Sequence, residues 1–164
     1  MTEGSALISK SRCDRIREQG YQAGYTDEEI SQLAVGNRFA YQLCTVVFGA
    51  GLLLTSIPIL AVAGAIAFLG VVLPHHPFDY VFNHGVRHVL EKPKQPRRSK
   101  QAKFACGLAT VTIGVIIYAF SSSLFVVGYA LGGILLVVAL LVSTVDICIP
   151  SMTYNRLFDR PSRT

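Results

Sequence analysis

Charged residues are absent from two long stretches of this 164-residue chain, residues 39–73 and residues 104–145. The sequence as a whole is 51% hydrophobic, and its mean hydropathy of +0.45 is too high for most soluble domains of this size. A helix needs about 20 apolar residues to cross a bilayer, so each uncharged stretch has room for a hairpin of two crossings. The absence of charge therefore argues against a soluble domain and predicts an all-α, polytopic membrane protein.

An apolar core of the kind found in cleavable signal peptides is also missing. The first part of the chain carries mixed charges instead, so we expect no such peptide. Residues 1–36 are predicted to form a cytoplasmic arm with a short helix. Thr26 and Glu29 have the spacing of a capping box, which predicts that a helix begins at Asp27.

The basic residues indicate on which side of the membrane the connecting segments lie. Of the 15 Lys and Arg residues, five precede the first uncharged stretch, seven lie between the two stretches and three follow the second. Because positive residues favour the cytoplasmic side, all three segments and both termini are predicted to be cytoplasmic, which requires an even number of crossings in each stretch. Contact with anionic lipid then explains the net charge of +5, and no nucleic-acid partner is expected.

Proline and serine mark where each stretch turns. Pro58 suits the first turn of a helix and disfavours helix before it, and three serines interrupt the second stretch at residues 121–123. The predicted membrane domain is 37–157, followed by a tail at 158–164. Its four crossings are placed at 37–55, 58–73, 103–120 and 124–147, with an interfacial helix and a basic linker at 74–102. Both hairpins start with a basic residue and Phe-Ala and end in a segment with Pro, Tyr and Asn, which either an internal duplication or chance explains.

All four histidines lie in one stretch, PHHPFDYVFNHGVRH, residues 74–88. Its apolar residues share one face of a helix and its polar residues the other, which is typical of an amphipathic helix on a membrane surface. His84 and His88 are one turn apart and are candidate metal ligands, but a zinc site needs three or four protein ligands. We expect no cofactor and predict that the polar side chains face lipid headgroups or a partner. The predicted surface residues are Asp79, Tyr80, Asn83, His84, Arg87, His88, Asp146, Ser151, Tyr154 and Asn155.

Three of the four cysteines, Cys44, Cys106 and Cys148, are predicted near the cytoplasmic ends of the crossings. A reducing compartment would keep them as thiols, and packing in an apolar helix is sufficient to explain Cys44. Cys148 and Cys106 are the candidate reactive thiols. Asp146 stands close to Cys148, and an ionisable group at this depth favours a functional site, unless it pairs with a nearby arginine such as Arg156.

The segments RFA, HPFDYVFNHGVRHVL, KFACGLA and DICIPSMTYN, in this order, resemble the landmarks of a bacterial family of small membrane proteins known as domain of unknown function 4395. The resemblance covers roughly residues 36–157 and implies four crossings of the bacterial cytoplasmic (inner) membrane. Many relatives close the last helix with Cys-x-x-Cys followed by tyrosine. Here Cys148 and Tyr154 match, and Ser151 replaces the second cysteine. A dithiol role implied by the relatives therefore needs Cys106 or a partner protein to supply the resolving thiol.

Three functions remain open. We favour a non-enzymatic accessory or assembly subunit of a larger membrane complex, because the chain is small, its apolar stretches are rich in glycine and it has no strong catalytic constellation. Gly128 and Gly132 have G-x-x-x-G spacing, for which packing within the chain is the expected role. The alternative is a thiol-based redox or sulfur-transfer protein centred on Cys148, with a small thiol protein as partner. A small transporter is a weaker alternative, since no charge marks a path through the apolar stretches. The expected partners are the lipid bilayer and either other membrane subunits or further copies of the chain.

Overall fold

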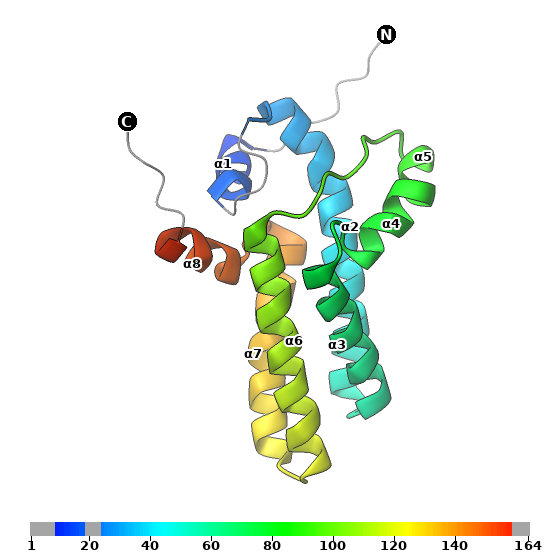
Figure 1. Cartoon of the computed structure of the whole chain (residues 1–164), viewed down its shortest axis with the longest axis vertical. Coiled ribbons are helices and arrows are strands. Elements are labelled where there is room, and N and C mark those ends of the chain that lie inside the picture. Colours follow the sequence, from blue (N-terminus) through cyan, green and yellow to red (C-terminus); the bar gives the residue numbers. More distant parts are fainter. Residues whose placement is uncertain (1–8, 19–23, 159–164) are drawn as a thin grey trace.

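The computed structural model describes residues 9–18 and 24–158, and these residues form helices without any strand (Figure 1). The predicted all-α fold is thus confirmed. The helices are α1 (Lys10–Glu18), α2 (Asp27–Leu53), α3 (Ile57–Val72), α4 (Pro77–Val81), the π-helical turn η1 (Phe82–Val86), α5 (Arg87–Val89), α6 (Lys100–Ser121), α7 (Phe125–Val145) and α8 (Ile149–Phe158). The predicted tail beyond Phe158 and parts of the predicted N-terminal arm, residues 1–8 and 19–23, lie outside the described residues.

The four long helices pack side by side, and each contacts two of the others. Helix α2 contacts α3 and α7, and α6 contacts α3 and α7 as well, so the hairpin α2–α3 lies along the hairpin α6–α7 (Figure 1). The core between them consists of apolar side chains from α2, α3 and α6: Phe48, Leu52, Leu60, Ala63, Ile113, Ile116 and Phe120. Close dispersion contacts of this kind hold helices together even where the surroundings are apolar.

Two helices are long and apolar enough to cross a membrane, α6 with 22 residues and α7 with 21. Helix α3 has only 16 residues, fewer than the roughly 20 that a crossing needs. It counts as a third candidate only together with Pro77–Val89, from which it is bent by 80°. Helix α2 is long, but its first half is polar and includes Arg38. The described residues therefore support a membrane protein with two or three candidate spans, which is fewer than the four crossings predicted.

The start of α2 follows the predicted capping box. The hydroxyl of Thr26 accepts a hydrogen bond from the Glu29 N–H at 3.3 Å, and the Glu29 carboxylate accepts one from the Thr26 N–H at 2.8 Å. These bonds satisfy amides that the first turn of a helix leaves without partners. The prediction that a helix begins at Asp27 is confirmed.

The end of α7 differs from the prediction. The helix stops at Val145, before the predicted boundary at residue 147, because Asp146 adopts the left-handed conformation with φ of +56°. The chain then turns into α8, a helix that was not predicted and that lies across the end of α6 (Figure 1). Cys148 and Ser151 are buried at this turn, whereas the end of α8 is exposed, including Leu157 and Phe158, each 68% exposed.

The glycines of the G-x-x-x-G pair pack within the chain, as predicted. A Cβ atom on Gly128 would clash with the ring of Phe120, and one on Gly132 would clash with Leu52. Glycine at these two positions lets α7 approach α6 and α2 closely.

Candidate functional site

An apolar cavity of about 130 Å³ lies between the four long helices, towards the end of the molecule that carries α1 and α8. Alanines from several helices line it, and their small side chains leave the space open. The lining also contains three cysteines, Cys44 from α2, Cys106 from α6 and Cys148 from the turn before α8, together with His76. The structure thus brings the two predicted candidate thiols, Cys106 and Cys148, to one site and adds Cys44 to them.

His76 directs one N–H group into this cavity. Its Nδ1 accepts a hydrogen bond from the Phe78 N–H at 3.3 Å. In a neutral imidazole the other nitrogen then carries the proton, and Nε2 lies 3.6 Å from the Cys44 sulfur. Burial, followed by the positive charge of Arg98, lowers the pKa of His76 to about 4. The ring is therefore neutral at pH 7, and its Nε2–H faces Cys44.

Gly70 of α3 allows His76 and Cys106 to lie next to each other. A Cβ atom on Gly70 would be 2.8 Å from His76 Cδ2 and 3.1 Å from the Cys106 sulfur. The imidazole therefore contacts Cys44 at one edge and packs beside Cys106 over the backbone of Gly70. Cys106 thus lies beside the imidazole that faces Cys44, and it lines the same cavity as Cys148.

A buried ion pair holds His76 in place. Arg98 donates two hydrogen bonds to the Asp79 carboxylate, from Nε to Oδ2 at 2.7 Å and from Nη2 to Oδ1 at 2.6 Å. Its Nη1 donates to the side chain of Asn37 at 2.8 Å, and its guanidinium lies over the ring of Tyr41. The backbone N–H of His76 donates to the same Asp79 carboxylate at 3.0 Å. This paired geometry is the strong form of an arginine–carboxylate contact, and it ties α2, α4 and the linker before α6 together.

A second acid–arginine cluster lies at the end of the hairpin α6–α7. The Asp146 carboxylate accepts hydrogen bonds from Arg38 Nε at 2.9 Å and from Arg12 Nη2 at 2.7 Å. Asp146 thus pairs with arginines, as one of the two alternatives predicted, and two of them are Arg12 and Arg38, which come from the N-terminal part of the chain. Asp79 follows the hairpin α2–α3 and binds Arg98, which precedes the hairpin α6–α7. In the same manner, Asp146 follows the hairpin α6–α7 and binds Arg38 of α2.

Four of the predicted surface residues are buried. Asp79 and Asp146 are enclosed by their arginines, and Asn83 accepts a hydrogen bond from the Gln95 N–H at 2.7 Å. Ser151 belongs to the first turn of α8, and its buried hydroxyl contacts the Gln101 carbonyl oxygen of α6. These polar groups turn inward because each finds an internal partner there, whereas an apolar neighbour such as Val89 is 84% exposed. The others remain at least partly exposed: Tyr80, His84, Arg87, His88, Tyr154 and Asn155.

Ser151, which stands where many relatives are expected to have a second cysteine, is next to Cys148. Its hydroxyl oxygen lies 3.1 Å from the Cys148 sulfur and 3.2 Å from the Gln101 carbonyl oxygen. Burial raises the pKa of Cys148, against the opposing effect of the hydrogen bonds with Ser151. Cys148 is accordingly a neutral thiol. A disulfide partner for it has to come from Cys106 or Cys44 within the cavity, or from another protein.

The candidate metal ligands His84 and His88 lie on η1 and α5, apart from the cysteines of the cavity. His84 contacts the Tyr80 carbonyl oxygen through Nδ1 at 2.8 Å and stacks on the Tyr80 ring. Across residues 9–18 and 24–158, no group of three or more His, Cys, Asp or Glu side chains is arranged to hold a metal ion. The fold does not bring a cysteine to these two histidines, which a metal site there would need.

The low pKa of His76 makes stability depend on pH. Above pH 6.5 the ring is neutral whether the chain is folded or unfolded. As the pH falls below 6.5, His76 is protonated in the unfolded chain while it stays neutral in the folded protein. The free energy of unfolding therefore decreases until the pH reaches the folded pKa of about 4. We expect the free energy of unfolding at pH 4 to be roughly 3 kcal/mol lower than at neutral pH for this reason. His76→Asn keeps an acceptor for the Phe78 N–H and should unfold with a flatter pH profile. Parallel profiles for the two proteins in denaturant titrations would contradict this.

The comparison with protein families matches residues 34–158 to a family described as a domain of unknown function, DUF4395. Neither curated proteins nor solved structures gave a match.

Proposed function

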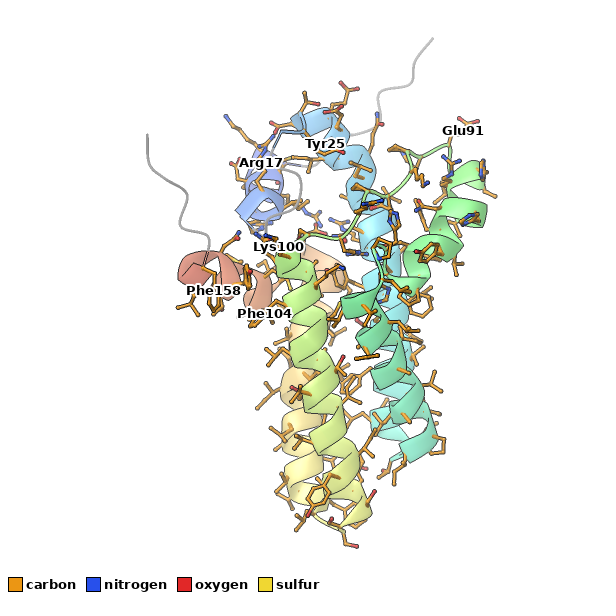
Figure 2. All side chains as sticks on the ribbon, viewed as in Figure 1. Arg17, Tyr25, Glu91, Lys100, Phe104 and Phe158 are labelled. Atoms are coloured by element: carbon orange, nitrogen blue, oxygen red, sulfur yellow. The ribbon has the colours of Figure 1, made fainter. Side chains whose placement is uncertain are left out.

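The chain belongs to the DUF4395 family, and we propose that it is a four-crossing protein of the bacterial cytoplasmic membrane with both termini in the cytoplasm. Helices α6 and α7 qualify as spans, and α2 and α3 lie along them. Nitrogen-bearing side chains gather at the end with α1 and α8, whereas carbon dominates along the far halves of the long helices (Figure 2). Large apolar side chains are exposed there, such as Val46, Val62 and Val111. Exposed apolar surfaces of this kind are typical of helices that contact lipid.

For its activity we propose a membrane dithiol protein that cycles between a dithiol and a disulfide. The observation that carries this is the convergence of Cys44, Cys106 and Cys148 on one cavity, from segments far apart in the sequence. Cys106 packs beside His76, whose other edge faces Cys44, and Cys148 lines the same cavity, so we propose Cys106 as the common member of the pair, with Cys148 or Cys44 as the other. In the disulfide form, the protein would take two electrons and two protons from the dithiol of a small partner protein. The partner's two S–H bonds break, its own S–S bond forms, and the membrane protein regains two thiols.

Oxidation of the purified protein tests this activity. The full-length protein is placed in lipid nanodiscs, treated with diamide, and its disulfides are mapped by mass spectrometry without reduction. We expect a disulfide that contains Cys106 and that Cys106→Ser abolishes. Cys13→Ser is the matched control, because Cys13 packs against Ile16 and Ile30 outside the cavity, and it should leave the disulfide intact. Recovery of all three cavity cysteines as free thiols after diamide would rule the proposal out.

The accessory-subunit hypothesis has its own support in the structure. Gly114 of α6 and Gly133 of α7 face outward, and a Cβ atom on either would meet no atom within 4 Å. Small residues on an outer face let the helix of another subunit approach closely. Purification in mild detergent distinguishes the two: a stable complex with larger subunits that survives Cys148→Ala favours this second function, whereas a mixed disulfide with a small thiol protein favours the first.

A further inference from the structure

We propose that the cavity binds the ring of a lipid-soluble quinone, and that this quinone removes the electrons of the cavity thiols. This inference rests on the proposed dithiol function, for which it names the electron acceptor. Three properties of the cavity carry it: its size and apolar walls, its single histidine N–H group, and the thiols beside that group.

The walls suit a neutral ring. The cavity volume of about 130 Å³ is close to the roughly 150 Å³ of a cavity that holds benzene. None of the described side chains that line it is charged at neutral pH, since Asp79 and Arg98 pair with each other outside the lining. A charged ligand would lose its hydration there without a partner. Residues such as Val47, Phe48 and Ile113 continue the lining along the helices, where an alkyl tail fits.

His76 selects for an acceptor oxygen. Within residues 9–18 and 24–158, the acceptor found next to its Nε2–H group is the Cys44 sulfur, at 3.6 Å, and sulfur is a weak acceptor. A quinone carbonyl oxygen can replace it and form a stronger bond. The ring remains neutral because burial holds the pKa of His76 near 4, so the N–H group is kept for donation. The Asp79–Arg98 pair fixes the backbone from which this ring projects.

The electron transfer balances without any further reactant. Two S–H bonds break and one S–S bond forms, between Cys106 and either Cys148 or Cys44. The two electrons and two protons pass to the quinone, whose two carbonyl oxygens become hydroxyl groups. The disulfide then reacts with the dithiol of the partner protein, which returns the cavity cysteines to thiols. The quinone is thus the lipid-side substrate and the partner dithiol the water-side substrate.

The test uses reduced full-length protein in nanodiscs and decylubiquinone as the probe. Ala139 of α7 lines the cavity, so Ala139→Leu should fill it and slow the loss of free thiols by about tenfold or more. Ala130→Leu is the matched control, because Ala130 lies on the exposed side of the same helix, and it should react like the unaltered protein. His76→Asn should raise the quinone concentration needed for half the maximal rate by about tenfold. Thiols lost and quinone reduced, followed by its ultraviolet absorbance, should agree at two thiols per quinone.

The outcomes separate this inference from the function on which it rests. If Ala139→Leu reacts as fast as Ala130→Leu, the quinone does not use the cavity and the inference is overturned. If diamide forms the Cys106 disulfide but decylubiquinone oxidises no thiol, the dithiol function stands and the quinone inference fails. If neither reagent forms a disulfide, both fail. Normal diamide oxidation of Ala139→Leu shows that the variant is folded and keeps its thiols.

Discussion

Asp79→Ala is expected to lower the free energy of unfolding by about 3–5 kcal/mol, as removal of one partner from a buried ion pair does. Asp79 and Arg98 are 0% and 3% exposed, so solvent screens their interaction little. Without the carboxylate, Arg98 keeps its charge in a buried site, and the His76 N–H loses its acceptor. The linker before α6 would lose its strongest contact with α4. Denaturant unfolding in detergent, followed by circular dichroism, measures the change.

Two further variants show whether the cost comes from the unpaired buried charge. Asp14→Ala removes the carboxylate of an exposed pair with Arg17, and such surface pairs contribute little, so its unfolding curve should nearly overlay that of the unaltered protein. Replacing both members, Asp79→Leu with Arg98→Met, should regain much of the loss, because no buried charge is then left alone. A double variant no more stable than Asp79→Ala would assign the loss to packing and contradict the electrostatic account.

Gly36→Ala is expected to destabilise the protein by about 1–3 kcal/mol, the usual cost of overfilling a packed site. The added Cβ would clash with the side-chain amide of Gln95 and lie 2.6 Å from Cε1 of Phe82. Neither neighbour can move freely. Gln95 donates a hydrogen bond to the Leu33 carbonyl oxygen at 3.0 Å, and Phe82 is 0% exposed. The loss should appear even though alanine favours a helix over glycine by about 1 kcal/mol.

Gly49→Ala on the same helix is the matched control. Its Cβ would lie 3.5 Å from Leu136 Cδ1, an ordinary contact distance, so the helix preference of alanine should leave this variant as stable as the parent or more so. Thermal unfolding of both variants in detergent gives the comparison. Equal transition temperatures for Gly36→Ala and Gly49→Ala would show that α2 does not need the small residue at position 36.

The sequence was sufficient to locate the helices because their signals are local. The uncharged stretches, the serine run at 121–123 and the capping box at Thr26 each act over a few residues, and the helix ends lie close to the predicted ones. The short α8 was missed because its start depends on the left-handed turn at Asp146. That turn is stabilised by Arg12, which is 134 residues away in the sequence. The amphipathic pattern around Asp79 placed this residue at the surface, and that prediction was wrong. Its carboxylate is buried because it pairs with the buried guanidinium of Arg98.

The composition and periodicity of the chain thus determined an all-α protein with long apolar helices, and its short motifs indicated the family. Only the tertiary structure decided which polar groups meet. It paired Asp79 with Arg98 and Asp146 with Arg12 and Arg38, and it gathered three cysteines around His76 in one cavity. The physical reason is that helix formation depends on neighbours within a turn or two. Ion pairs and cavities instead depend on how distant helices pack, and this packing is set by contacts such as those of Gly70 and Gly132.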